Sequence, residues 1–262
     1  MTINIISDIH GIFKNSNYQF LTGFEFCRLK PADVLVIAGD LGYHGCCYNN
    51  EIDFIQNDKS IKENFKEVVV VKGNHDFYNT EDKKYDLNFD PSYSQWNFIK
   101  EIDNTIFICS PLFSPIKKYK NVILECLSDF RFIPDWTIDK NNETFDKNLQ
   151  FLYNSYNKYK DCGKNIILVT HHCPTQKLIP KEYRYSSINE AFTIMNSYKD
   201  SRLDELLNSN IIKYWIHGHI HSYVKQKINN ITYIRNPIGY SRIDMFGYRN
   251  ECNFLYNCII EV

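Results

Sequence analysis

Five short polar motifs hold seven of the chain's eight histidines, together with three aspartates and one asparagine. In chain order they are Asp8-Ile9-His10-Gly11, Gly39-Asp40, Gly73-Asn74-His75-Asp76, His171-His172 and His217-Gly218-His219-Ile220-His221. Imidazole, carboxylate and amide donors in one set favour an intermediate divalent metal such as manganese, iron, zinc, cobalt or nickel. A calcium site would be built from oxygen ligands alone, and an all-thiolate zinc site would be built from cysteines. The motifs therefore predict a metal site.

The set of donors is too large for one ion. We expect seven of the donors to act as ligands. Two ions share such a set when one carboxylate bridges them, and they then lie roughly 3.5–4 Å apart, an arrangement that activates water for attack at phosphorus. Because Asp40 is the only donor in its motif, we expect it to be the bridge.

An apolar, β-branched run precedes each motif, which is typical of a buried strand. The runs are 3–6, 34–37, 68–71, 166–169 and 211–216. A charged side chain is unfavourable in a dry core without a partner, so the polar residues should lie just beyond the strand ends. Open α/β sheets gather ligand-binding residues at such ends. Five converging strand ends would bring the distant donors together.

The five motifs, in this order, resemble the signature of the calcineurin-like metallophosphoesterases: D-x-H, G-D, G-N-H-[DE], H and G-H-x-H. The resemblance spans Asp8 to His221 and implies an αββα sandwich, in which two mixed sheets pack face to face with helices outside and the metals at one edge. It implies the following two ligand sets: Asp8, His10, Asp40 and His221 for one metal, and Asp40, Asn74, His171 and His219 for the other. It also implies that His75 is not a ligand, but contacts the phosphate and protonates the leaving group.

Each motif alone has a plainer interpretation. Gly39-Asp40 after a strand is usually a turn. Asn74 and its neighbours would suit the N-terminus of a helix. Two histidines at strand spacing, such as His219 and His221, could both face solvent. The order of the motifs and their strand context together favour the metal site.

Five further residues near the motifs have open roles. His217 follows an apolar run and is expected to support the ligands by a hydrogen bond. His172 has two alternatives, a phosphate contact or a structural role. His44 could reach the substrate or belong to a plain loop. Asp76 either orients His75 or completes its turn. Arg131 could hold a phosphate, although pairing with Asp129 is the commoner outcome for such an arginine.

The ligands predict the mechanism. Two divalent cations strongly lower the pKa of a shared water, so a bridging hydroxide would attack the phosphorus. Asn74 and His75 would stabilise charge on the phosphate oxygens. His75 would then protonate the departing oxygen.

The residues that follow Asp40 narrow the substrate class. The protein phosphatases of the family have G-D-x-V-D-R-G, whereas Leu41-Gly42-Tyr43-His44 follows Asp40 here. A phosphodiesterase with manganese is therefore favoured, a small-molecule phosphomonoesterase is the nearest rival, and a nuclease is third. A non-catalytic binding module of the same fold is the alternative from another class. Three stretches resemble a little-characterised bacterial-type branch: Ser128 to Arg131, Trp215 to His219 and Asn236 to Tyr240.

Composition indicates a cytoplasmic enzyme that acts on a small molecule. Hydrophobic residues make up 44% of the 262-residue chain, enough for a large core. The net charge of −1 gives no global reason to bind nucleic acid or an anionic membrane. No long apolar run could span a bilayer, and residues 2–6 are already needed as a strand, which leaves no room for an export signal. Because the ligands run from position 8 to 221, we expect a single domain over 1–262. The sequence does not indicate an oligomeric state.

The remaining segments complete the sandwich. Spaced apolar residues predict helices at 17–28, 51–65, 143–160 and 188–207. Further strands are predicted at 105–109, 121–126, 223–228, 231–235 and 253–260. Cap-forming loops over the substrate are expected at about 77–104, 110–142 and 173–187, where Tyr, Phe, Lys and Arg are frequent.

Overall fold

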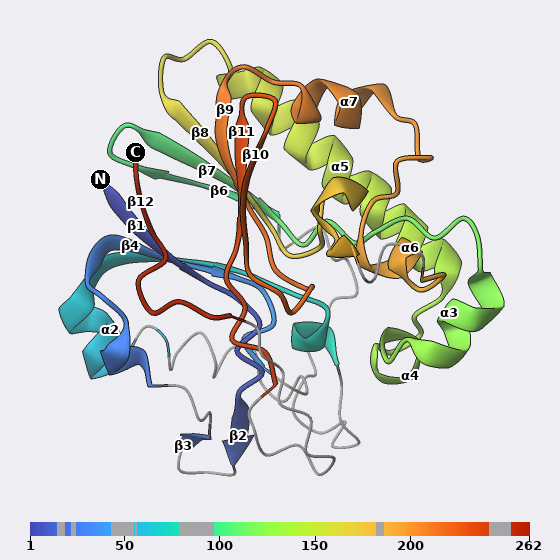
Figure 1. Ribbon diagram of the computed structural model, residues 1–262, viewed down its shortest axis with the longest axis horizontal. Helices are drawn as coiled ribbons and strands as arrows, with labels where there is room; N and C mark the ends of the chain where they lie inside the picture. Colours follow the sequence, from blue (N-terminus) through green and yellow to red (C-terminus); the bar gives the residue numbers. More distant parts are fainter. Residues whose placement is uncertain are drawn as a thin grey trace.

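The structure is a computed structural model that describes residues 1–14, 19–21, 25–42, 55, 57–78, 97–181, 186–240 and 253–262. Two mixed β-sheets pack face to face in its described part, with helices on their outer faces (Figure 1). The N-terminal amino group lies 3.2 Å from the carbonyl oxygen of Val262, so the two ends of the chain meet. The predicted αββα architecture is confirmed.

The first sheet has four strands in the order β12-β1-β4-β5. Its strands are β1 (Thr2–Ile6), β4 (Ala32–Ala38), β5 (Phe65–Val71) and β12 (Ile259–Glu261). β1, β4 and β5 are parallel, and β12 is antiparallel to β1. The carboxyl ends of the three parallel strands therefore lie at one edge, where the first three motifs begin.

The second sheet has six strands in the order β10-β11-β9-β8-β7-β6. Its strands are β6 (Phe98–Ile102), β7 (Thr105–Ser110), β8 (Asn165–Thr170), β9 (Ile212–Ile216), β10 (Val224–Ile228) and β11 (Ile231–Arg235). The four inner strands are parallel, and the two edge strands are antiparallel to their neighbours. The last two motifs follow β8 and β9. A separate hairpin pairs β2 (Ile12–Lys14) with β3 (Gln19–Leu21).

The side chains of a strand point alternately to the two faces of its sheet, and this alternation produces the layers of the sandwich. In β8, Ile167 and Val169 pack toward the first sheet, whereas Ile166 and Leu168 pack toward the outer helices. Since successive side chains of a strand point to opposite faces, a continuous apolar run serves both cores. Burying each such side chain contributes about 1.5–3 kcal/mol. The sandwich therefore holds the motif-bearing strand ends on a rigid support.

The helices cover the outer faces of the sheets. α5 (Ile138–Tyr159) begins where Thr137 accepts a hydrogen bond from the Lys140 amide. One face of α5, including Phe145, Leu149 and Leu152, packs on the six-stranded sheet. The other helices are α2 (Lys59–Asn64), α3 (Lys120–Cys126), α4 (Asp129–Phe132), α6 (Asn189–Phe192) and α7 (Ser201–Leu207). Short 3₁₀ turns are η1 (Phe26–Arg28), η2 (His75–Phe77) and η4 (Gln176–Leu178). In the described ranges, no helix has the length and hydrophobicity to cross a bilayer.

Several predicted elements were wrong. The strand predicted at 121–126 is helix α3, in which Ile123 is buried while Val122 and Leu124 are exposed. Its β-branched residues favour a strand locally, but packing decided the outcome. The helix predicted at 188–207 is interrupted, because Thr193 forms a backbone bridge with Cys173 and Asp200 caps a new helix, α7.

Other predicted bounds also changed. The helix predicted at 17–28 is replaced in the described residues by β3 and η1, since residues 19–21 pair with β2. The helix predicted at 51–65 ends at Asn64, and the last strand covers only Ile259–Glu261. All three predicted cap loops contain regular structure: β6 lies within 77–104, α3 and α4 lie within 110–142, and the 3₁₀ turn η4 lies within 173–187. The single domain and the cap itself stay predictions.

Candidate metal centre

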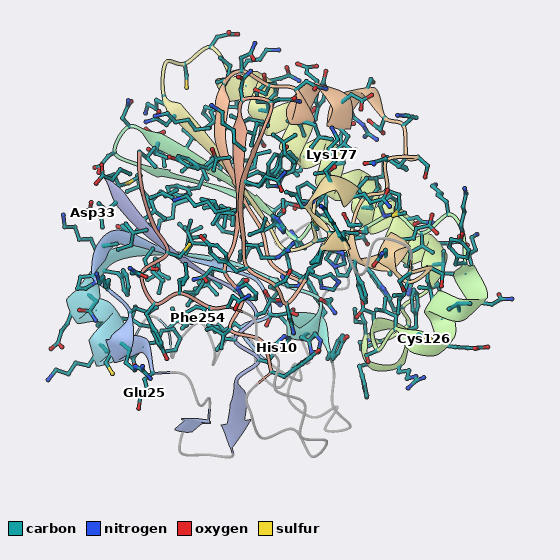
Figure 2. All side chains as sticks on the ribbon, viewed as in Figure 1. His10, Glu25, Asp33, Cys126, Lys177 and Phe254 are labelled. Carbon is teal, nitrogen blue, oxygen red and sulfur yellow. The ribbon has the colours of Figure 1, made fainter. Side chains whose placement is uncertain are left out.

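The five motifs meet where the parallel strands of both sheets end. The amide of Asp8 donates to the Gly39 carbonyl at 3.0 Å, which joins the loops after β1 and β4. The amide of Gly218 donates to the His171 carbonyl at 2.9 Å, which joins the loops after β8 and β9. The amide of His219 donates to Asp8 Oδ1 at 2.9 Å and so connects the two sheets. Figure 2 labels His10, which lies at these converging strand ends.

One group of donors consists of Asp8, His10 and His221, whose ligand atoms all lie within 4.8 Å of one another. His221 Nε2 lies 3.5 Å from Asp8 Oδ1. His10 Nε2 lies 3.0 Å from His221 Nε2 and 3.8 Å from Asp40 Oδ2. Asp40 is thus at the border of this group.

A second group forms on the other side of Asp40. Its Oδ2 lies 3.3 Å from His171 Nε2. That nitrogen is 3.1 Å from Asn74 Oδ1 and 3.2 Å from His219 Nδ1. All seven predicted ligands therefore lie in two adjoining groups that share Asp40. His75 is also within ligand range of His10 and Asp40, so geometry alone does not separate it from the ligands.

The donor spacing fits divalent ions. Two ligands at right angles around one ion, each about 2.1 Å from it, are about 3.0 Å apart. The pairs His10–His221 and His171–His219 have nearly this spacing, 3.0 and 3.2 Å. Among the described residues, Asp8 Oδ2 is one of the buried atoms without a hydrogen-bond partner. Polar atoms in such positions are expected around an ion.

The backbone at four of the proposed ligands is strained. Asp8, His10, Asp40 and His219 have positive φ angles of 53°, 48°, 52° and 69°. This left-handed conformation costs a residue with a Cβ roughly 1–2 kcal/mol. Such strain persists where the surrounding fold imposes it, and it is concentrated at functional sites. Here it turns successive motif side chains toward one point.

Two glycines permit the close approach of the loops. A Cβ on Gly39, whose φ is +88°, would lie 2.1 Å from His171 Nδ1. A Cβ on Gly73 would lie 2.1 Å from Asp40 Oδ1. Glycine is therefore needed before Asp40 and before Asn74, because a larger residue at either position would displace a proposed ligand.

The electrostatics of the centre favour a cation. Burial raises the pKa of Asp8, but its hydrogen bond and charge interaction with His221 outweigh this and lower that pKa to about 2. Burial lowers the pKa of His171, but the charges of Asp40 and Asp8 outweigh it and raise that pKa to about 9. Burial also holds the pKa of His219 well below its usual value. The carboxylates thus create a negative electrostatic potential that a bound metal ion would neutralise.

A family model of calcineurin-like phosphoesterases matches residues 1–223. The chain belongs to this family. As a calcineurin-like phosphoesterase it is a metal-dependent hydrolase of phosphate esters, and the His and Asp groups described above are its candidate sites for divalent ions. No curated protein sequence matches the chain significantly.

Solved structures with a similar fold agree with this family. Phosphopantetheinyl hydrolase from Mycobacterium tuberculosis has a TM-score of 0.65 and 13% identity, with 92% of this chain and 90% of that chain covered. A dimetal phosphatase from Danio rerio has a TM-score of 0.50 and 12% identity, with coverages of 89% and 86%. At these identities the likeness establishes the calcineurin-like phosphoesterase fold alone.

Two of the residues with open roles, His172 and His217, lie beside proposed ligands. His172 is buried, its ring stacks on His219 at 4.1 Å, and its Nδ1 lies 3.2 Å from the Ser114 amide. His217 is also buried, with Nδ1 3.3 Å from the Gly218 carbonyl. The surroundings of His172 favour its structural alternative, and the support of the ligands by His217 stays a prediction. His44 lies outside the described residues.

Asp76 and Arg131 take unexpected partners. Asp76 accepts hydrogen bonds from the amides of Gly42 and Gly73, at 2.9 and 2.8 Å, and so joins two motif loops. Arg131 donates to the Glu125 carbonyl. Its expected pairing with Asp129 was wrong, because Asp129 is buried and accepts hydrogen bonds from Asn74 and Tyr78 instead.

Three residues near the centre were missed as site residues. Asp129 and Tyr78 contact Asn74 directly. Tyr240 lies with its ring centroid 4.5 Å from that of His10 and 4.8 Å from that of His221. Two of them occur in stretches that resemble the bacterial-type branch, Ser128 to Arg131 and Asn236 to Tyr240, so a signal was present in the sequence.

Proposed function

We propose that the chain is a phosphodiesterase whose seven ligands hold two divalent ions, with manganese favoured. The position of Asp40 carries this proposal, because its Oδ2 lies within 3.8 Å of a donor in each group. A carboxylate there suits a bridge between two ions. When bound, such ions would supply an activated water near neutral pH.

Side chains beside the proposed ligands would then bind the phosphate group of the substrate and donate a proton to the leaving group. His75 follows the ligand Asn74, and its backbone amide donates to Asp40 Oδ1 at 2.9 Å. Its ring stands next to that of His10, with centroids 4.6 Å apart. In this position His75 would contact a phosphate oxygen and give a proton to the departing oxygen. Tyr240, beside the same histidines and 36% exposed, would border the ester group of the substrate.

Charge favours a diester over a monoester. A phosphate monoester carries about −1.5 to −2 charges at pH 7, whereas a diester carries one. Arginine side chains are the usual partners of the more highly charged group. In the part of the chain that the structure describes, Arg131 and Arg235 donate instead to backbone carbonyls, of Glu125 and of Ser222. The phosphomonoesterase remains the rival, and the segments 77–104, 110–142 and 173–187 remain candidates for the cap.

Paired nitrophenyl esters test the reaction class. The metal-free protein is loaded with Mn²⁺, its metal content is measured, and kcat/KM is compared for bis(4-nitrophenyl) phosphate and 4-nitrophenyl phosphate. We expect two ions per chain and the higher kcat/KM with the diester, from which one nitrophenolate leaves. A higher kcat/KM with the monoester would favour the phosphomonoesterase. Two bound ions without activity on either ester would favour a non-catalytic binding module.

A further inference from the structure

The side-chain amide of Asn74 has two partners on its nitrogen side. Asn74 Nδ2 donates to Asp129 Oδ1 at 2.7 Å and lies 3.1 Å from the hydroxyl oxygen of Tyr78. On its other side, Asn74 Oδ1 lies 3.1 Å from His171 Nε2, within the second group of donors. The amide therefore spans from the segment 110–142, a candidate for the cap, to the proposed metal centre.

The hydrogen-bonding capacity of these groups decides which end of the amide faces the centre. Asp129 Oδ1 acts as the acceptor in its contacts with Asn74 and Tyr78, so it selects the NH₂ end of Asn74. The Tyr78 hydroxyl donates to Asp129 Oδ1 at 2.6 Å, which leaves its lone pairs to accept from Asn74. If the side-chain amide of Asn74 were rotated by half a turn, its oxygen would face the oxygens of Asp129 and Tyr78, which both act as acceptors here. The oxygen, the atom that can ligate a cation, is thus held toward His171.

Packing makes this arrangement rigid. Asp129, Asn74 and Tyr78 are all buried. Asp129 is the first residue of α4, and Phe130 next to it packs on an apolar cluster. The buried members of that cluster are Phe77, Tyr78, Phe113, Ile133 and Trp136. The same cluster therefore fastens both α4 and the turn after Asn74, so neither partner can move alone.

We propose that Asp129, with Tyr78, is a positioning residue that holds the side-chain oxygen of Asn74 toward the metal centre. This inference rests on the proposed function only in that the centre binds divalent ions. Partners that orient metal ligands typically change metal affinity roughly ten- to hundredfold when they are removed. The segment 110–142 would then complete the metal centre as well as cover it.

Metal affinity tests the proposal without any substrate. Mn²⁺ is titrated calorimetrically into metal-free wild type and Asp129→Ala, and circular dichroism checks the fold. We expect Asp129→Ala to bind one of the two ions roughly ten- to hundredfold more weakly. The matched control is Glu190→Ala, which removes a buried carboxylate that accepts from the amides of Lys117 and Lys118. This control should keep the wild-type Mn²⁺ affinity even if its stability falls.

Exchanging the two side chains separates positioning from mere packing. Asn74→Asp alone places two carboxylates in contact, and their repulsion should turn the new carboxylate out of its position toward the centre and so weaken Mn²⁺ binding. In Asn74→Asp/Asp129→Asn, the new amide donates to the new carboxylate, whose other oxygen faces the centre. We expect the double variant to bind Mn²⁺ at least tenfold more tightly than Asn74→Asp. A double variant no tighter than Asn74→Asp would overturn the proposal.

The remaining outcomes are also decisive. Equal Mn²⁺ affinities for wild type and Asp129→Ala would overturn the positioning role and leave the proposed function standing. A wild type that binds no Mn²⁺ would overturn both. If Asp129→Ala does not fold, Tyr78→Phe replaces it, with Tyr156→Phe as the control, whose hydroxyl bonds Ser209 far from Asn74 in the sequence. We expect weaker Mn²⁺ binding only in Tyr78→Phe, and unchanged binding would contradict the proposal.

Discussion

His75 packs among aromatic rings beside the proposed ligands. Its ring lies between the rings of His10 and Tyr78, with centroid distances of 4.6 and 4.3 Å, and is only partly buried. Its backbone amide donates a hydrogen bond to Asp40. In the proposed function its ring meets the substrate, while the seven proposed ligands hold the ions.

Replacement of His75 should separate proton donation from metal binding. We expect His75→Ala to keep both ions, because the two ligand groups do not depend on its ring. Its kcat should fall roughly 10²–10⁴-fold with poor leaving groups such as phenol, and much less with nitrophenol, which needs no proton. The measurement is metal content together with kcat for both esters.

Asp40→Asn provides the contrasting variant. Since Asp40 borders both groups of donors, loss of its charge should weaken both ions and lower the rate with every ester. Full metal occupancy in Asp40→Asn would count against a bridging role. Loss of metal from His75→Ala would show that this histidine is a ligand.

The loops after the strands depend on glycine for close packing. Gly39 and Gly163 both have positive φ angles, +88° and +79°. Only Gly39 is crowded, because a Cβ there would meet the ring of His171, whereas nothing lies within 4 Å of a Cβ on Gly163. The two positions therefore separate backbone strain from displacement of a ligand.

Alanine at these two glycines should have different effects. Gly163→Ala should lower the free energy of unfolding by roughly 1–2 kcal/mol, the cost of a left-handed residue, and leave Mn²⁺ affinity unchanged. Gly39→Ala should also weaken Mn²⁺ binding, roughly ten- to hundredfold, because His171 must shift. Denaturant unfolding and Mn²⁺ titration of both variants check this. Equal Mn²⁺ affinities would show that the loop adapts to the added methyl group.

At the scale of the molecule, the proposed centre joins the two sheets. Asp8, Asp40 and Asn74 follow strands of the first sheet, and His171, His219 and His221 follow strands of the second. The shared core between the sheets already holds them together. Ions bound by both sets of loops would add a further link that exists only in the folded state.

Metal removal should therefore lower thermal stability. A site occupied at a hundred times its Kd stabilises the folded state by about 2.7 kcal/mol. For a chain of this size this corresponds to a rise in Tm of about 5–10 °C per site. We expect Tm to fall by at least this amount when Mn²⁺ is exchanged for a chelator, and the difference to shrink in Asp40→Asn. Identical Tm values with and without Mn²⁺ would argue against ions that link the sheets.

The parts of the fold that the sequence predicted correctly are those indicated by a pattern in neighbouring residues. The β-branched runs before the motifs became β1, β4, β5, β8 and β9, because such runs suit strands buried on both faces. The segment 121–126 was wrongly predicted as a strand for the same reason. Its branched residues indicate a strand, but only Ile123 finds a buried position, and the rest of α3 faces solvent. Short elements outside the sheets follow their packing rather than their propensity.

The types and order of the proposed ligands are determined by the sequence alone. Each lies directly after a strand, and the parallel arrangement of these strands makes their ends converge. Only the tertiary structure decided how Asn74 is oriented, since Asp129 lies 55 residues away and was expected to pair with Arg131. The physical reason is that a strand and the residue after it are local, whereas a hydrogen bond between a helix and a distant loop depends on how the two pack.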